Sequence, residues 1–595
     1  MDQLTNHIYL YSDTCNVYII REGDHAVLID FGSGAILQAL QEAGIRAEAI
    51  LVTHHHRDQI QGLQLAAEAG IPVFVPHSEQ ELVSEAGQMW QAREIYNNYN
   101  NRQDRFSILE SVPIAGTLKD YSYMKAGPFS FEVLPTPGHT VGSVSLLLHL
   151  ENAVYAFTGD LIYGPGKVWS LAATQWSYNG GEGIAFSILS LLSLEEKNPK
   201  MLLPSHGAPM DVSAIPDTVE NLRSLLSFRR HNPRLFLLRE TPYEALTPHL
   251  LFNRTSMSNS YVLISESKKA LVLDLGYDFM AGCASGTDRS SRRPWLYTFP
   301  FLFREYGIQQ IDACICTHYH DDHVAGFNLL RDTYGAEVWC AETFADLLEH
   351  PDHYDLPCLW YDPISVDRKL PLKVPIVWEE YTLILHPLSG HTRYSAAIEF
   401  QADGKKILCG GDQYADEDGL ACNYVYKNMF EYTDFEESAA LYQRIKPDLI
   451  ITGHWMGFTK DKDYLDQITR RGSQLARLHQ ALLPYGEYKA PSSDFCIQMH
   501  PYQAFAAPGE TVDVTVEAVN PLPKECVLTC SLVLSAGCIC DTTVQSQMTP
   551  AHGAALLSFR IQAPETPARR IRIGCDLTAG DRRLGQQGEM LLTIR

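Results

Sequence analysis

The chain has 595 residues and a formal net charge of −24, with 45% hydrophobic and 20% charged residues. These values are typical of folded globular proteins, so they exclude a largely disordered chain, and the length predicts about three to five domains. The acidic balance disfavours a general basic face, so a nucleic-acid partner is not expected. No apolar run reaches about 18 residues, so we predict no membrane span.

The N-terminal segment MDQLTNHIYLYSDTCNVYII lacks the charged and apolar regions of a secretory signal. The 14 cysteines are scattered, a pattern that predicts reduced thiols and a cytoplasmic location. Six of them fall in the last hundred residues: Cys496, Cys526, Cys530, Cys538, Cys540 and Cys575. Their CxxxC and CxC spacings do not match a zinc ribbon, so we favour small apolar side chains in strands over a thiolate metal site.

The sequence contains an internal repeat that begins at His7 and again at His249. HIYLYSDTCNVYIIREGDHAVLIDFGSG and HLLFNRTSMSNSYVLISESKKALVLDLGYD each predict a strand, a turn and an apolar strand ending in Asp-x-Gly, at Asp30 and Asp274. ILVTHHHRDQIQGLQLAAEAGIPVFV and CICTHYHDDHVAGFNLLRDTYGAEVWC then each predict a buried strand, a histidine-rich loop, an amphipathic helix and another strand. The correspondence continues through PTPGHT and PLSGHT, FTGD and CGGD, and LLPSHG and IITGHW. The pattern indicates a duplicated domain of roughly 230–250 residues.

Three domains are predicted: residues 1–235, 236–489 and 490–595. The first boundary follows a predicted helix over 217–231, and the second follows one over 464–483. The two repeats are predicted to be α/β. The last segment reads as short alternating strands, VDVTVEAV, CVLTCSLVL, ALLSFRIQA, RIRIGCDL and MLLTIR. That spacing favours an all-β sandwich of immunoglobulin-like type, without catalytic residues, that acts as a packing or interaction module.

The strongest chemical signal lies in residues 317–323 of the second repeat, where four potential metal ligands occupy six positions on a strand-to-helix loop. They are His318, His320, Asp322 and His323. Three more groups, each at the end of an apolar strand, follow later: His391, Asp412 and His454. Imidazole and carboxylate suit a borderline divalent cation such as Zn²⁺, and seven such groups are enough for two metals that share one carboxylate.

The order HxHxDH, GHT, GD and GH resembles the metallo-β-lactamase-fold superfamily, and the PTPGHT and PSHG forms resemble its glyoxalase II and lactonase-type branches. The resemblance covers roughly residues 1–460 and implies an αββα sandwich in each repeat, with metals at one edge of the sheets. In the second repeat it implies a first metal held by His318, His320 and His391, a second metal held by Asp322, His323 and His454, and a bridging Asp412. In the first repeat it implies a first metal on His54, His56 and His139, a second on Asp58 and His206, and a bridging Asp160.

The first repeat departs from this pattern at Gln59, which stands where the second repeat has His323. A neutral amide oxygen is a weaker ligand for zinc, so we expect about three tightly bound metals per chain rather than four. His55 is expected to point to the other side of the loop. Asp30 and Asp274 are not expected to bind metal, and the resemblance implies that they support the metal loops.

The expected activity is hydrolysis of an ester, thioester, lactone, amide or phosphoester by a metal-activated hydroxide, which Asp322, and Asp58 in the first repeat, would orient. The expected cofactor is zinc, two ions in the second repeat and one or two in the first, with iron or manganese as alternatives. Three other functions stay open: a mononuclear iron oxygenase of sulfur compounds, a repeat that serves only as a binding or dimerisation module, and, less favoured, nucleic-acid processing.

The expected partner is a small-molecule substrate, and oligomerisation is left open. His318 follows Asp274 by 44 positions, whereas His54 follows Asp30 by 24. The additional residues of the second repeat include Arg289, Arg292 and Arg293, which could contact an anionic substrate, and Trp295 and Tyr297, which could line a pocket. The alternative is that this segment is a solvated surface loop. In the first repeat an aromatic pocket is expected from Tyr163, Trp169, Trp176 and Tyr178, with core packing as the alternative.

Overall fold

The computed structural model describes residues 1–595 except 93–95, 97–106, 278–294, 456–457, 460–461 and 484–495. The described residues form two compact units. The first consists of Met1–Pro242, Tyr277–Gly307 and Leu329–Gly335, and the second of Tyr243–Gly276, Ile308–Asn328 and Ala336–Arg595. The first unit therefore contains the first repeat together with segments that belong to the second repeat in sequence.

The first repeat contains two sheets. One has seven strands in sequence order: β1 (Asp2–Gln3), β2 (Ile8–Ser12), β3 (Asn16–Glu22), β4 (His25–Ile29), β5 (Arg46–Leu51), β6 (Val73–Pro76) and β7 (Gly116–Leu118). The other has five, in the order β12 (Met201–Pro204), β11 (Ala153–Gly159), β10 (Val144–Leu150), β9 (Phe129–Pro135) and β8 (Tyr123–Ala126). Its helices include α1 (Ile36–Glu42), α2 (Arg57–Ile60), α3 (Leu63–Glu68), α4 (Glu81–Ser84), α5 (Ala86–Ala92), α6 (Glu182–Glu196), α7 (Ala214–Leu226) and α8 (Leu237–Glu240).

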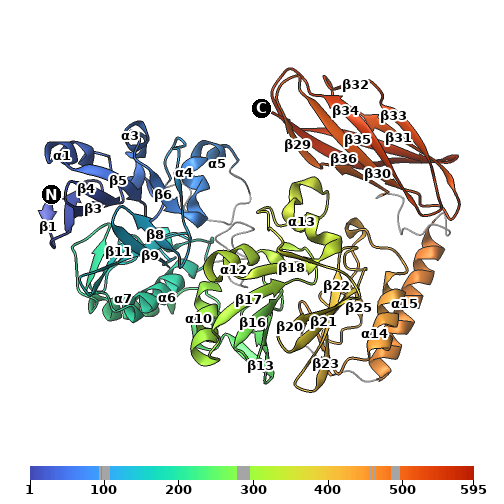
Figure 1. Ribbon diagram of the computed structural model, residues 1–595, viewed down its shortest axis with the longest axis horizontal. Helices are drawn as coiled ribbons and strands as arrows, with labels where there is room; N and C mark the ends of the chain where they lie inside the picture. The colour runs from blue at the N-terminus through green and yellow to red at the C-terminus, as the bar shows by residue number, and fades with distance from the viewer. Residues whose placement is uncertain (93–95, 97–106, 278–294, 456–457, 460–461, 484–495) are drawn as a thin grey trace. The chain divides into compact units, whose positions relative to one another are not determined.

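The alternation of side chains along each strand builds a four-layer sandwich. On β10, Leu146 and Leu148 face the core between the sheets, where Phe131 and Phe157 also lie. Leu147 faces the opposite core, under α6 and α7. A third core lies between the seven-stranded sheet and helices α1 and α3 (Figure 1). The predicted helix over 217–231 is α7, which begins three residues earlier and ends at Leu226.

The second repeat uses the same plan. Its seven-stranded sheet contains β13 (Tyr243–Thr247), β14 (Leu250–Asn253), β15 (Tyr261–Ile264), β16 (Lys269–Leu273), β17 (Gln310–Ile315), β18 (Glu337–Ala341) and β19 (Arg368–Leu370). Its six-stranded sheet contains β20 (Pro375–Trp378), β21 (Tyr381–Pro387), β22 (Ala396–Ala402), β23 (Lys405–Cys409), β26 (Leu449–Ile451) and β27 (Phe458–Thr459). A separate hairpin pairs β24 (Tyr414–Ala415) with β25 (Ala421–Cys422). The helices among its described residues include α10 (Trp295–Glu305), α11 (Asp321–Val324), α12 (Phe327–Tyr334), α13 (Ala345–Glu349), α14 (Asp434–Ile445) and α15 (Lys462–Leu482).

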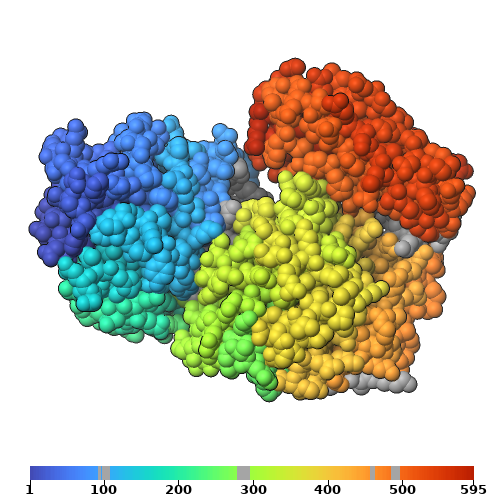
Figure 2. All heavy atoms as spheres, in the orientation of Figure 1, coloured from blue at the N-terminus to red at the C-terminus, as the bar shows by residue number. Residues whose placement is uncertain are grey.

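The C-terminal segment consists of strands in two sheets and forms a continuous orange-to-red body in Figure 2. One sheet orders β28 (Ile497–His500), β30 (Thr511–Val519), β34 (Ala554–Gln562) and β32 (Ile539–Cys540). The other orders β29 (Gln503–Ala506), β36 (Arg582–Ile594), β35 (Ala568–Ala579), β31 (Cys526–Val533) and β33 (Val544–Thr549). The all-β prediction is confirmed, although the sequence pattern missed β28, β29, β32 and β33. Buried cysteines, Cys526, Cys530 and Cys575 among them, contribute to the core of this segment.

Among the residues that the structure describes, no helix combines the length and the apolarity needed to span a membrane.

Candidate metal centres

In each repeat, a buried aspartate fixes the loop that carries the first histidines. Asp30 and Asp274 follow β4 and β16 and have positive φ angles of 57° and 53°. Their carboxylates accept hydrogen bonds from the backbone N–H groups of Thr53, at 2.8 Å, and Thr317, at 2.7 Å. These bonds hold the ends of β5 and β17, where the histidine-rich loops begin, so both aspartates lie where their supporting role requires.

The second repeat brings its seven predicted ligands together. Three buried histidines, His318, His320 and His391, have ring nitrogens within 4.8 Å of one another. The Nε2 atom of His391 lies 3.2 Å from the Nδ1 atom of His320. A second group within the same distance consists of Asp322, His323 and His454. Asp412 lies between the two groups, with its oxygens 3.6 Å from His391 Nε2, 3.4 Å from His323 Nε2 and 3.1 Å from His454 Nε2.

The donor atoms of this cluster suit divalent cations. The Nε2 atoms of His318 and His323 and the Oδ1 atom of Asp412 are buried and form no hydrogen bond within the described part of the chain. Buried polar atoms normally have partners, so three such atoms in one cluster indicate a ligand. Burial lowers the pKa of His320 to about 3 and that of His318 well below its usual value. Both imidazoles are therefore neutral and can offer a lone pair to a metal.

The first repeat assembles a similar but less complete cluster. His54, His56 and His139 form a buried group, in which His139 Nε2 lies 3.0 Å from His56 Nδ1. Asp58, Asp160 and His206 form the second group. The Nε2 atom of His54 is buried without a hydrogen bond, and burial lowers the pKa of His54 to about 3. This first group thus has the chemistry of a three-histidine metal site.

The model of the metallo-beta-lactamase superfamily matches residues 11–206 and 253–454, which together make up more than half of the chain. The chain belongs to the metallo-beta-lactamase superfamily. The two matched stretches are its two repeats.

Curated relatives align with part of the chain. The "Probable metallo-hydrolase YqgX" of Bacillus subtilis is 27% identical over 206 residues, which are 33% of this chain and 87% of the relative. A hydroxyacylglutathione hydrolase of Bdellovibrio bacteriovorus is 27% identical over 163 residues, 27% of this chain and 50% of the relative. The chain therefore spans only about half the length of that hydrolase. The solved structure of the B3 metallo-beta-lactamase BLEG-1 is 22% identical and covers 35% of this chain and 95% of the lactamase chain, with a TM-score of 0.29.

Gln59 changes the second group of the first repeat. Its side chain is buried, its Nε2 atom donates to Asp160 Oδ2 at 3.2 Å, and its Oε1 atom has no hydrogen bond. His206 turns its Nδ1 atom toward Asp160, at 2.8 Å, and its Nε2 atom toward Asp58, at 3.3 Å. In the second repeat His454 instead presents one atom, Nε2, to both carboxylates. The second group of the first repeat is therefore arranged differently from its counterpart.

The structure adds positioning residues that the motifs did not indicate. Asn428 is buried, and its Nδ2 atom lies 3.3 Å from His320 Nε2 and donates to the carbonyl of His391 at 3.0 Å. In the first repeat, Glu79 accepts from the backbone N–H groups of His55, at 3.0 Å, and Gly142, at 2.9 Å. Glu79 also lies 3.0 Å from His55 Nδ1, and His55 is not part of the group formed by His54, His56 and His139. No local sequence signal identifies Glu79 or Asn428, because their contacts are distant in the chain.

Of the four aromatic residues expected to line a pocket in the first repeat, some lie at the surface and one is buried in the core. The half-exposed ring of Trp169 is stacked on His206 with ring centroids 4.0 Å apart, and Tyr163 is stacked on Trp169 at 5.7 Å. Trp176 is buried and stacked on Phe186 at 5.3 Å, so it is a core residue. Tyr178 is exposed.

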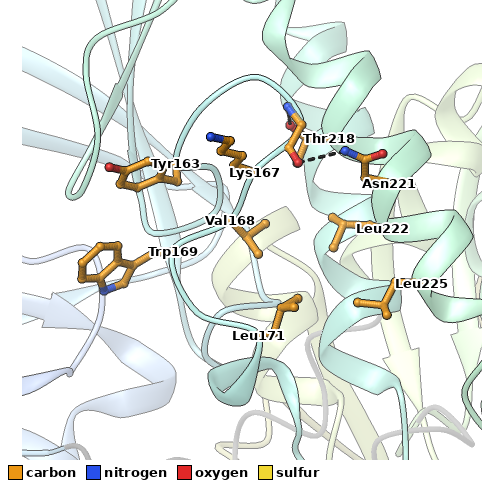
Figure 3. Close-up of a pocket in the computed structure, with 10 residues that line it drawn as sticks. Tyr163, Lys167, Val168, Trp169, Leu171, Thr218, Asn221, Leu222 and Leu225 are labelled. Carbon is orange, nitrogen blue, oxygen red and sulfur yellow. Dashed lines mark hydrogen bonds between the residues drawn. The ribbon is translucent and has the colours of Figure 1, made fainter.

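Trp169 also lines a pocket of about 450 Å³ between the 163–171 loop and α7. Figure 3 shows Val168 and Leu171 of the loop facing Leu222 and Leu225 of α7 across this pocket.

In the insertion of the second repeat, Arg289, Arg292 and Arg293 lie outside the described residues. Trp295 and Tyr297 are described, and both are buried, with exposed fractions of 0% and 5%. Tyr297 belongs to the core under α6 of the first repeat rather than to a pocket wall. The hypothesis that these two aromatic residues contact substrate is therefore not supported by their packing.

Proposed function

We propose that the chain is a metal-dependent hydrolase whose main catalytic centre is in the second repeat and holds two zinc ions. In this proposal, His318, His320 and His391 would hold one metal, Asp322, His323 and His454 would hold the other, and Asp412, whose oxygens lie near both groups, would contribute to both. The convergence of these seven side chains, with three donor atoms left without hydrogen bonds, carries the proposal. When bound, two such cations would lower the pKa of the attacking water and would stabilise negative charge on the carbonyl oxygen of the substrate.

Asp322 is the residue that we propose to orient the attacking water and to receive its proton. Its Oδ2 atom lies 3.2 Å from His454 Nε2, and its side chain remains 18% exposed, so water can reach it. An aspartate carboxylate at neutral pH only accepts hydrogen bonds, as this role requires.

For the first repeat we propose one tightly bound metal on His54, His56 and His139, with Asp160 beside it. Asp58 and His206 make a second metal possible, but Gln59 supplies an amide oxygen where the second repeat supplies imidazole. An amide donates less charge to zinc, so this second metal binds more weakly. We therefore propose about three tightly bound metals per chain, and iron or manganese as the alternative metals.

The substrate that we propose is a small acyl compound, with a thioester first among the ester, thioester and lactone classes. This order follows from the relatives named hydroxyacylglutathione hydrolase, since an acylglutathione is a thioester. The half-exposed Trp169 beside His206 offers an apolar face for the acyl part of a substrate at the first centre. For the C-terminal segment we propose an immunoglobulin-like fold with an accessory role, because its two packed sheets present no cluster of metal-binding groups among their described residues.

A substrate screen with metal-reconstituted protein tests the proposal. The panel should contain thioesters, esters, lactones and phosphodiesters, and it should compare the wild type with His320→Ala. His350→Ala is the matched control, because His350 is exposed and lies in the same unit outside the metal groups. We expect hydrolysis and metal content to fall in His320→Ala and to be unchanged in His350→Ala. Unchanged turnover in His320→Ala would refute the second repeat as the main catalytic centre, and tightly bound iron in native protein would favour an oxygenase.

A further inference from the structure

The loop that carries His139 is supported by helix α6. Gly138 has a φ of 152°, and a Cβ atom at this position would lie 2.2 Å from Ser187 Oγ, so the loop backbone packs directly on the helix. One helical turn further on, Ser190 Oγ donates a hydrogen bond of 2.7 Å to the carbonyl oxygen of Pro137. This bond fixes the backbone two residues before the metal-binding imidazole of His139.

Ser190 is in turn bonded to Tyr297, which comes from α10 in the insertion of the second repeat. The two hydroxyl oxygens are 2.7 Å apart and buried. A serine hydroxyl has one proton, and the carbonyl of Pro137 can only accept, so the proton of Ser190 points to Pro137 and Tyr297 donates to Ser190. The ring of Tyr297 is stacked on Phe186 of α6 at 6.1 Å. All these residues belong to the same compact unit.

In the second repeat, the corresponding loop, which carries His391, is supported by residues of the second repeat itself. Ser438, the counterpart of Ser190, lies 3.3 Å from the carbonyl of Ser389, the counterpart of Pro137. That carbonyl also accepts a bond of 2.7 Å from Gln413 Nε2, which bonds Ser438 at 2.6 Å. The first repeat has Leu161 at the position of Gln413, so it lacks this amide. The first repeat thus has no donor of its own at the position of the Gln413 amide. Tyr297, from the insertion of the second repeat, provides a hydroxyl donor to Ser190 instead.

We propose that Tyr297 is a positioning residue of the first metal centre, acting on His139 through Ser190 and Pro137. The insertion of the second repeat then completes a metal centre whose ligands all belong to the first repeat. The inference rests on the proposed function, because it requires a metal on His54, His56 and His139. Outer hydrogen bonds that orient metal ligands typically change metal affinity by about tenfold to a hundredfold when they are removed.

The test uses the full chain with two ligands of each second-repeat group replaced, namely His318→Ala, His320→Ala, His323→Ala and His454→Ala, so that metal binding reports the first centre. Zinc affinity is measured by competition with a chromophoric chelator, and the ligand geometry by the visible absorption of the cobalt(II) form. Tyr297→Phe should weaken zinc binding about tenfold and shift the cobalt spectrum. Ser190→Ala should do the same, and the double variant should add little, because both changes break one chain of bonds.

Tyr306→Phe is the matched control, since Tyr306 lies just after α10, in the same unit, and its ring contacts Phe301 with centroids 6.3 Å apart. It should leave affinity and spectrum unchanged. If Tyr297→Phe lowers only the melting temperature, with zinc affinity and spectrum intact, Tyr297 merely packs and the inference is overturned. If the background protein itself binds no metal at the first centre, the proposed first centre fails, and the inference with it.

Discussion

Gln59 and Ser205 in the first repeat correspond to His323 and Gly453 in the second, and the structure shows that the two positions are coupled. A Cβ atom on Gly453 would lie 2.8 Å from His323 Cε1 and 1.7 Å from Asp412 Oδ1. Gly453 does not have a positive φ, so the space occupied by the side chains of Asp412 and His323, rather than the backbone conformation, requires glycine. In the first repeat Ser205 fills this space, and its hydroxyl donates to Asp30 Oδ2 at 2.6 Å.

We therefore expect that a fourth tight metal requires Gln59→His together with Ser205→Gly. In the second repeat, Asp274 Oδ2, the counterpart of Asp30 Oδ2, lies 3.1 Å from His323 Nδ1. A new imidazole at position 59 would therefore compete with the Ser205 hydroxyl for the Asp30 carboxylate, and it would also compete with Ser205 for space. Overpacking of this kind costs about 1–3 kcal/mol, which lowers the melting temperature of a domain of this size by about 2–4 °C per kcal/mol. The double variant removes the obstruction and should strengthen the second metal of the first repeat at least about tenfold, or 1.4 kcal/mol.

Metal counting after graded treatment with a chelator, together with calorimetric melting of the metal-free proteins, measures both effects. Wild type should retain about three metals, Gln59→His about three with a lower melting temperature, and the double variant about four. The reciprocal Gly453→Ser should release a metal from the second repeat. A single Gln59→His variant that gains a fourth metal without loss of stability would refute the steric reasoning.

Two further predictions concern the supports of the fold. Glu79→Gln should destabilise the first repeat by about 1–3 kcal/mol, because a glutamine can accept from only one of the two N–H groups, of His55 and Gly142, that Glu79 now satisfies. Urea unfolding would show this loss, and an unchanged midpoint would mean that Glu79 does not join the two ligand loops. Truncation before Pro491 should leave a folded hydrolase with wild-type turnover on a small substrate, and a soluble but inactive product would contradict the accessory role of the C-terminal segment.

The ligand groups could be predicted from sequence because five short motifs recur in the same order in both repeats. Each motif ends a buried strand, so the ends of the strands bring His318, His391 and Asp412 to one edge of the sheets. The asymmetry at Gln59 was also visible as a single exchanged residue. The sequence alone therefore predicted the composition of each group and identified Gln59 as the position at which the two repeats differ.

The supports of these groups could not be predicted, because they depend on contacts between distant residues. Ser190 and Tyr297 are 107 positions apart, and Glu79 lies 63 positions before Gly142. Tyr297 has the sequence context of a substrate loop, yet its ring is buried against α6. The coupling of Gln59 with Ser205 likewise appears only when the space around Gly453 is known.

Anomalous X-ray diffraction at the zinc edge, from crystals of the zinc-loaded wild-type chain, tests the central claim most directly. The account predicts two strong peaks in the second repeat, one among His318, His320 and His391 and one beside His323 and His454, with Asp412 touching both. It predicts one strong peak in the first repeat, on His54, His56 and His139. A single peak, or none, among the seven ligands of the second repeat would contradict the dinuclear centre.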